Sequence, residues 1–198
     1  RSHLVERSPP LQSLLKKRIG RVAKFHQDMK SALKATGGSA FILSNELVDA
    51  FPVRVFKGTK EAILELFLSL KDDDLTEKWL PASDLPDSRQ FEFSRDSQQR
   101  LEVHHSYQTW INDWLPSFKN GRLVTIDYGG TSAEIYHRKP QGTLRAYYHH
   151  ERLAGSDIYR LCGRQDLTAD VNFEDLIYWG EKTGLFTKSL MPLNLSSL

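Results

Sequence analysis

Short apolar runs alternate with an amphipathic stretch at the start of the chain. Residues 3–5 and 22–28 predict two strands. Between them, Ser8 and Pro9 are suited to be the N-cap and the first residue of a helix. The apolar side chains of that helix fall on one face, namely Leu11, Leu14, Leu15, Ile19 and Val22. The pattern therefore predicts a strand, an acidic turn, a helix and a second strand.

A third strand is predicted at residues 40–43, after the two glycines at residues 37–38. Its apolar run shows no alternation, which predicts that both of its faces are covered. The pattern is weaker from residue 57 to residue 101, which we interpret as an insertion. Apolar residues at 62–70 favour a hairpin strand, whereas the polar, proline-containing residues 72–90 are typical of a loop.

The strongest helical period lies between residues 107 and 118. Apolar positions recur at spacings of three and four, which predicts a core helix formed by Tyr107, Trp110, Ile111, Trp114, Leu115 and Phe118. Pro116 should bend this helix or end it early. The next stretch, RLVTIDYGG, predicts a strand that ends in Asp127 and Tyr128.

A last helix is predicted from Phe173 to Thr183. Asn172 and Asp175 resemble a capping box at its start, and Gly184 is suited to end it. Strands that alternate with helices favour an α/β fold with a mostly parallel sheet. We expect one domain over residues 1–198, because a chain of this length is too short for two domains of ordinary size.

Polar side chains follow the predicted strands at the points where the strands end. The carboxyl ends of parallel strands meet at one edge of a sheet, which is where such sheets bind ligands. We therefore expect one acidic edge formed by Glu6, Asp28, Asn45, Glu46 and Asp127. Glu102 is expected there too, because it precedes the helix that leads back to the Asp127 strand.

Each acidic residue at a strand end has a second interpretation as a helix cap or a turn former. Several of them on one edge would instead hold a ligand with hydroxyl or cationic groups. Glu6 is suited to accept hydrogen bonds from a ribose diol. Glu46 and Glu102, if they lie close together, are suited to clamp a guanidinium group.

Composition narrows the classes of function. Basic and acidic residues number 27 and 25, so the chain lacks the strong positive charge typical of nucleic-acid binding. No apolar stretch approaches the roughly 20 residues of a membrane helix, so no membrane insertion is expected. The single cysteine, Cys162, excludes an internal disulfide and suits a reducing compartment.

The remaining reactive residues predict no metal site and no thiol nucleophile. Two pairs of adjacent histidines, at 104–105 and 149–150, lack a carboxylate or cysteine at a recognised ligand spacing. Cys162 has no evident histidine partner, and we interpret it as a turn residue beside Gly163. Neither G-x-G-x-x-G nor G-x-x-x-x-G-K-[ST] occurs in the chain.

Five blocks in register resemble the MidA family of S-adenosylmethionine-dependent methyltransferases: HLVERSPPLQSLLKK, LSNELVDAFPVRVF, LVTIDYGG, GTLRAYYHH and GRQDLTADVNFEDL. The resemblance spans residues 4–185 and is weaker in the insertion. It implies a class I, Rossmann-like methyltransferase sheet that begins at its second strand, with the glycine-rich first loop before Arg1. It also implies a hairpin insertion, a substrate-side segment at 131–172 and a C-terminal helical excursion.

The same resemblance assigns roles to single residues. It implies that Glu6, Asp28 and Asn45 bind S-adenosyl-L-methionine, with Glu6 at the ribose and Asp28 near the adenine. It places Asn45, Glu46 and Asp49 beside the reacting methyl group as catalytic residues. The substrate side would be formed by Asp127, Tyr128, Gly142 and Thr143, and by Glu102 from its place on the acidic edge. Two departures from the family pattern, Cys162 and Asp170, leave the roles of the 162–172 block open.

The resemblance therefore implies methyl transfer to a nitrogen of a protein substrate, an arginine guanidinium being the first candidate. A mitochondrial member of the family methylates a complex I subunit, so such a subunit or its bacterial counterpart is a candidate partner. The expected compartment is the bacterial cytoplasm, with the mitochondrial matrix as the alternative. A different class of function stays open, in which a truncated methyltransferase fold docks a partner without catalysis. The oligomeric state and the activity of this chain alone stay open as well.

Overall fold

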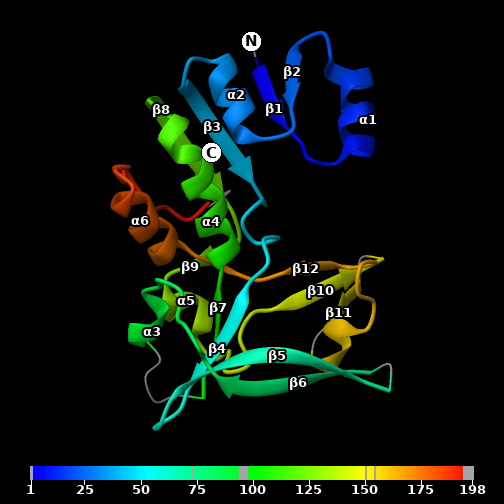
Figure 1. Ribbon diagram of the computed structural model, residues 1–198, viewed down its shortest axis with the longest axis vertical. Coiled ribbons are helices and arrows are strands. Elements are labelled where there is room, and N and C mark those ends of the chain that lie inside the picture. Colours follow the sequence, from blue (N-terminus) through cyan, green and yellow to red (C-terminus); the bar gives the residue numbers. More distant parts are fainter. Residues whose placement is uncertain (1, 73, 94–97, 150, 154, 194–198) are drawn as a thin grey trace. The chain divides into compact units, whose positions relative to one another are not determined.

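A computed structural model describes residues 2–72, 74–93, 98–149, 151–153 and 155–193. The chain forms two compact units (Figure 1). One comprises Arg1–Ser44 and Trp110–Ile126, and the other comprises Asn45–Thr109 and Asp127–Leu198. Both units are assembled from two separate stretches of sequence. The prediction of a single domain over residues 1–198 stays a prediction.

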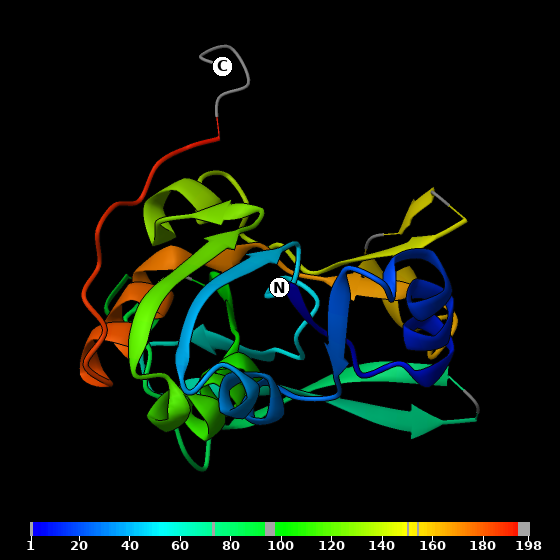
Figure 2. The same ribbon diagram turned by 90° about the horizontal axis from the view of Figure 1, so that it is seen from above.

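The first unit contains two pairs of strands with helices around them. Strands β1 (Ser2–Val5) and β2 (Ala23–His26) pair in parallel, with Ser2 opposite Ala23 and Val5 opposite His26. Strands β3 (Ser39–Asn45) and β8 (Asn120–Ile126) form the other pair, visible side by side in Figure 2. The helical elements are α1 (Pro9–Ile19), α2 (Met29–Ala35), the end of α4 (His105–Trp114) and the 3-10 turn η1 (Leu115–Ser117).

The second unit is built mainly from antiparallel strands. Its largest sheet has the order β6-β5-β4-β7, formed by β4 (Arg54–Gly58), β5 (Ile63–Lys71), β6 (Asp74–Pro81) and β7 (Arg100–Val103). A three-stranded sheet has the order β11-β10-β12, from β10 (Arg145–Tyr148), β11 (Glu151–Leu153) and β12 (Asp166–Thr168). Short strands β9 (Gly129–Gly130) and β13 (Val171–Asn172) pair in parallel. The helical elements are α3 (Gln90–Phe93), α5 (Ser132–Tyr136), α6 (Phe173–Lys182) and the 3-10 turn η2 (Gly155–Tyr159).

Local signals in the sequence account for most helix boundaries. The Ser8 hydroxyl accepts a hydrogen bond from the amide of Leu11, and Pro9 begins α1, as predicted. The core helix α4 gives way to η1 at Leu115, directly before Pro116, as predicted from the missing proline N–H. The Asn172 side chain accepts from the amide of Asp175 at the start of α6. After α6, Gly184 adopts a φ of 91°, which suits a glycine stop.

Three predictions about elements were wrong or incomplete. Residues 74–81, interpreted as loop, form strand β6, which pairs with β5 along its whole length. Helix α2 was not predicted. In strand β3 the exposure alternates, and Phe41 and Leu43 are 67% and 60% exposed, so only one face is covered. The apolar face of α1 is also partly exposed at Leu11 and Leu14.

Candidate functional site

The carboxylate of Asp127 organises the polar turn that follows strand β3. Asp127 lies directly after β8, and its Oδ2 accepts hydrogen bonds from the amides of Leu47 (3.1 Å), Val48 (2.8 Å) and Asp49 (3.4 Å). Its Oδ1 accepts from the amide of Tyr128 at 2.9 Å. Both oxygens are therefore engaged with the backbone. Charge-assisted bonds of this kind fix a turn strongly, so Asp127 positions its neighbours.

Glu46 is held at the tip of this turn in an unusual backbone conformation. Its φ is 47°, in the left-handed region that costs a residue other than glycine about 1–2 kcal/mol. The side chain is exposed, and its Oε1 accepts a hydrogen bond from the Tyr128 hydroxyl at 3.2 Å. The negative charge of Glu46 raises the pKa of that phenol, which stays a neutral donor. A strained residue with an available carboxylate is characteristic of functional sites.

Asp49 is a second carboxylate on the same turn, in a drier setting. The residue is only 7% exposed, and its pKa is raised, first by burial and then by the nearby Asp127. Arg145 opposes this rise. The Asp49 carbonyl accepts from the amide of Ala169 at 3.0 Å, which connects the turn to the loop after β12. A raised pKa makes a carboxylate a better proton acceptor, so Asp49 is suited to take up a proton.

Glu102 lies at the end of β7 with no exposed surface. Its Oε1 accepts from the amide of Thr143 at 2.9 Å and of Leu144 at 3.4 Å, and its Oε2 accepts from the Thr143 hydroxyl at 3.2 Å. Burial raises the pKa of Glu102 to about 7, although these bonds act in the opposite direction. The carboxylate thus supports the 142–144 loop from inside. Its predicted contact with substrate stays a prediction.

Gly142 explains how the loop can pass so close to that carboxylate. Its φ is 77°, and a Cβ at this position would lie 1.9 Å from Glu102 Oε1. Only glycine satisfies both the backbone conformation and the space. Thr143 continues the connection, because its hydroxyl accepts from the amide of Asp170 at 2.9 Å. The predicted substrate-side residues Glu102, Gly142 and Thr143 are therefore in direct contact.

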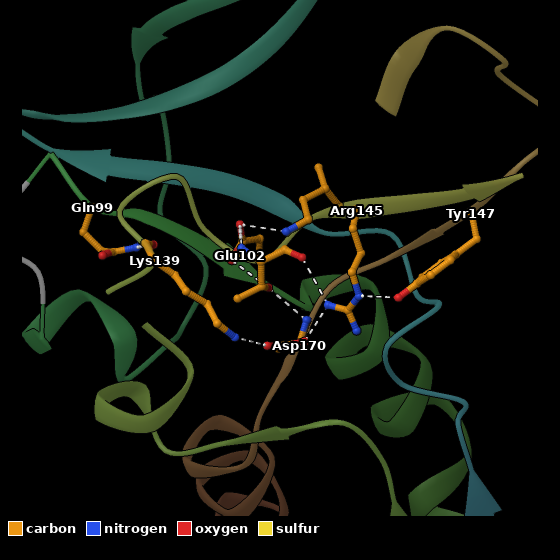
Figure 3. A network of polar contacts seen from close by, with 8 residues as sticks. Gln99, Glu102, Lys139, Arg145, Tyr147 and Asp170 are labelled. Carbon is orange, nitrogen blue, oxygen red and sulfur yellow. Dashed lines mark hydrogen bonds and ion pairs between the residues drawn. The ribbon is translucent and has the colours of Figure 1, made fainter. Parts of the chain in front are cut away.

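A set of charged residues beside this loop was not predicted as a site. Asp170 accepts hydrogen bonds from Arg145 Nη1 at 2.5 Å and from Lys139 Nζ at 3.0 Å, and Figure 3 shows it between them. Arg145 Nε also donates to the Tyr147 hydroxyl at 3.2 Å. The available signal in the sequence was a cluster of basic residues within 138–152. It was obscured because the overall charge is nearly balanced.

In the first unit, Glu6 and Asp28 follow the carboxyl ends of the parallel neighbours β1 and β2. The amide of Ser8 donates to Glu6 Oε1 at 2.7 Å, and the amide of Ser31 donates to Asp28 Oδ1 at 2.7 Å. Asp28 is the N-cap of α2, and the hydrogen bond from the Ser31 amide lowers the pKa of its carboxylate. Both residues therefore have the structural roles of turn former and cap. Their predicted cofactor contacts stay predictions.

The histidine pairs do not change this picture. His104 is 1% exposed, and burial lowers the pKa of its imidazole to about 4, so it is uncharged at neutral pH. Within the part of the chain that the structure describes, no group of three potential metal ligands comes together. His150 lies outside the described residues. Cys162 lies in a turn before Gly163, and its Sγ donates to the carbonyl of Tyr159.

The chain matches solved structures over most of its length. One of them is a crystal structure from Burkholderia thailandensis, described as a "likely methyl transferase" bound to S-adenosyl-homocysteine. The match with it covers 92% of this chain, with a TM-score of 0.77 and 22% identity. A second crystal structure from the same organism, of an uncharacterized COG1565 superfamily protein, gives a TM-score of 0.73 at 23% identity, again over 92% of this chain. This chain spans 48% and 50% of the chains in those two structures, about half their length. The likeness confirms the predicted α/β methyltransferase fold.

Two further comparisons complete the assignment. No curated protein matches the sequence significantly. Among the described residues, no helix is long and apolar enough to cross a membrane. A family model described as "Putative S-adenosyl-L-methionine-dependent methyltransferase" matches residues 1–191. Because that match covers nearly the whole sequence, the chain belongs to this family of S-adenosyl-L-methionine-dependent methyltransferases.

Proposed function

We propose that the full protein transfers a methyl group from S-adenosyl-L-methionine to a nitrogen of a partner protein, an arginine guanidinium being the first candidate. The observation that supports this most is the carboxylate of Glu46. It is exposed, it is held by Tyr128, and it stands on a turn fixed by three backbone amides to Asp127. Such an arrangement presents a pre-oriented negative charge to a cationic or hydrogen-bonding nitrogen.

The cofactor fits residues of the first unit by their chemistry. Glu6 has one oxygen bonded to Ser8, and its Oε2 has no hydrogen-bond partner among the described residues, so it can accept from a ribose hydroxyl. Asp28 would lie near the adenine, and Asn45 near the reacting group. When bound, S-adenosyl-L-methionine supplies an electrophilic methyl group on a sulfonium. The residues of this chain would hold and align the partners of the reaction.

Two carboxylates would divide the work at the nitrogen. Glu46 would orient the nucleophile and increase its electron density through a charge-assisted hydrogen bond. Asp49, whose pKa is raised by burial, would take up the proton that the methylated nitrogen releases. Tyr128 would keep Glu46 in place through its hydroxyl. This division explains why two acidic residues are placed three positions apart on a single turn.

The proposed partner is a subunit of respiratory complex I or its bacterial counterpart. It is supported by the resemblance of the LSNELVDAFPVRVF and LVTIDYGG blocks to the MidA family. The corresponding compartment would be the bacterial cytoplasm or the mitochondrial matrix. The first of these blocks contains the Glu46 turn, and the second contains Asp127, which supports that turn. The resemblance and the geometry therefore point to the same part of the chain.

The replacement Glu46→Gln tests the catalytic role. Glutamine has the same shape and the same left-handed backbone cost, so the turn should persist while the charge is lost. We expect calorimetry to show binding of S-adenosyl-L-methionine by the full-length variant within about twofold of wild type. Transfer of labelled methyl groups to proteins of a lysate from cells lacking the gene should fall about 100-fold or more, the scale of a lost catalytic carboxylate.

The matched control is Glu61→Gln, which removes the same charge from an exposed turn between β4 and β5. That variant should retain both binding and transfer. Unchanged transfer in Glu46→Gln would remove Glu46 from the mechanism. If the full-length wild type does not bind the cofactor at all, the non-catalytic docking function would be favoured in its place.

A further inference from the structure

A basic cavity lies in the second unit beside the loop that Glu102 supports. Its volume is about 430 Å³, and its charged lining comprises Arg138, Lys139, Arg145, Arg152 and Asp170. Four cations and one carboxylate leave a net charge of +3 in a small space. Like charges gathered in this way repel one another unless an anion compensates them. The cavity therefore has the electrostatic character of an anion site.

The one carboxylate of the cavity is already shared. Asp170 accepts from Arg145 at 2.5 Å and from Lys139 at 3.0 Å. Figure 3 shows Asp170 between these two basic residues. Arg145 is further oriented by the Tyr147 hydroxyl and by the carbonyl of Thr143. Neither Arg138 nor Arg152 forms an ion pair with any residue that the structure describes. These two exposed guanidinium groups supply the excess charge.

The backbone around the cavity is fixed before any ligand arrives. Glu102 accepts from Thr143 and Leu144, and Gly142 leaves no room for a side chain between loop and carboxylate. Gln99 holds the preceding turn through the carbonyl of Lys139 at 2.8 Å. Arg138 has a φ of 56°, a conformation uncommon for residues other than glycine. A wall ordered in this way loses little entropy on binding.

The cavity is connected to the Glu46 turn within the second unit. The amide of Ala169, next to Asp170, donates to the carbonyl of Asp49 at 3.0 Å. Arg145 also lies close enough to Asp49 to act on the pKa of that carboxylate. A carboxylate turn for a cationic group and a basic cavity for an anionic group are thus neighbours. A ligand that carries both charges, such as a peptide, would contact both.

We propose that this cavity binds an acidic side chain of the protein substrate. The acidic residue would lie close in the substrate's sequence to the residue that is methylated. This inference rests on the proposed function in one respect, namely that the bound acidic residue belongs to the protein that is methylated. Carboxylate binding itself is independent of methyl transfer. The guanidinium groups of Arg138 and Arg152 would form charge-assisted bonds to the carboxylate, and Arg145 would orient it from the cavity wall. The cavity would then select substrates by their local charge.

Direct binding of an acidic peptide tests the proposal. The probe is fluorescein-labelled hexaglutamate, measured by fluorescence anisotropy against the full-length protein at low salt, without cofactor. The double replacement Arg138→Gln and Arg152→Gln should weaken binding at least tenfold, the scale expected for two lost charge-assisted contacts. Both side chains are exposed and lack ion pairs among the described residues, so the fold should persist.

A charge-matched control separates the cavity from the general charge of the protein. Arg21→Gln together with Arg122→Gln removes two exposed guanidinium groups from the first unit and should leave hexaglutamate binding unchanged. Equal weakening in both double variants, or none in the Arg138 and Arg152 variant, would overturn the proposal. Two competition measurements test for free anions. If phosphate displaces the probe, and if acetylated single glutamate binds as tightly as hexaglutamate, the cavity binds free anions and the proposal is overturned.

The two proposals fail in different ways. Loss of methyl transfer in Glu46→Gln concerns the reaction only, because the anisotropy measurement contains no cofactor and no transfer. Glu46→Gln should bind hexaglutamate as wild type does. Conversely, if the cavity does not bind hexaglutamate, the proposed role of Glu46 is unaffected.

Discussion

At the scale of single residues, the clearest consequence concerns Glu102, a carboxylate with no exposed surface. Its pKa of about 7 lies above the usual 4.5, so the folded chain binds this proton more tightly than the unfolded chain does. The group therefore contributes stability fully below about pH 4.5, and that contribution is lost as the pH rises through 7. Its size is on the order of 3 kcal/mol.

Replacing Glu102 with Gln should remove this pH dependence. The amide oxygen can still accept from the amides of Thr143 and Leu144, so the loop keeps its support. The free energy of unfolding, measured with urea at pH 5 and pH 8, should fall less with rising pH in the variant than in wild type. Glu61→Gln is the control for an exposed glutamate. Identical pH profiles for wild type and Glu102→Gln would show that the carboxylate titrates elsewhere.

The residues of the site were partly predictable. The AFILSNELVDAFP stretch places polar side chains where an apolar run ends, and this was enough to single out Asn45 and Glu46, whereas the role of Asp49 was implied by the family resemblance. That Asp127 would join them required only the rule for strand ends, and the structure shows this contact. The partners of Glu102 could not be predicted, because they lie in the 142–144 loop, which belongs to no helix or strand and so has no strand end to mark it. Burial of a carboxylate leaves no local pattern in the sequence.

At the scale of elements, N-caps divide into exposed and buried types. Asp28 caps α2 from an exposed position and accepts one amide bond, from Ser31. Asn172 caps α6 from a position only 1% exposed, and its Nδ2 also donates to the Ser132 hydroxyl at 2.8 Å. Loss of the buried cap removes a second hydrogen bond as well, the one that the Ser132 hydroxyl accepts while it donates to Glu174. The two caps should therefore differ in their contribution to stability.

We expect Asn172→Ala to cost about 2–3 kcal/mol and Asp28→Ala about 1 kcal/mol of unfolding free energy. Urea unfolding of both variants, followed by circular dichroism, measures the difference. Asn172→Asp retains a capping oxygen but loses the donor to Ser132. Its loss of unfolding free energy should lie between those of Asp28→Ala and Asn172→Ala. Equal costs for both alanine variants would show that the Ser132 contact adds nothing.

Predictability of the elements followed the range of the interactions that form them. The caps at Ser8 and Asn172 and the stop at Gly184 are local, and the sequence was sufficient to predict them. Strand β6 was missed because its stability depends on pairing with β5, while its own eight residues are half polar and lie in a proline-containing stretch. Two basic groups from other strands lie over the ring of its Trp79. Lys57 Nζ of β4 is 4.2 Å from the ring centroid, and Arg100 Cζ of β7 is 5.2 Å from it. Tertiary contacts of this kind override local propensity.

At the scale of the whole molecule, the first unit exposes an apolar strand face. Phe41 and Leu43 project from β3 with 67% and 60% of their surface exposed. Neighbouring exposed apolar groups promote association between molecules. The opposite face of β3 carries Ile42, which is more covered. The two faces of the same strand should therefore respond differently to a polar substitution.

The double replacement Phe41→Thr and Leu43→Thr should reduce light scattering by the concentrated 198-residue chain. Threonine keeps the strand propensity, so the free energy of unfolding should change by less than about 1 kcal/mol. The control Ile42→Thr should instead lower stability without reducing scattering, because it removes covered apolar surface. Unchanged scattering in the double variant would show that this face does not drive association.

The left-handed backbone at Glu46 has a consequence for any laboratory evolution of this protein. A glycine or asparagine at that position would relieve the torsional cost while discarding the carboxylate. Selection for heat resistance alone would thus accumulate such replacements at this codon, whereas under the proposed catalytic role of Glu46 selection for turnover would remove them. Parallel lineages under the two regimes should diverge first at position 46.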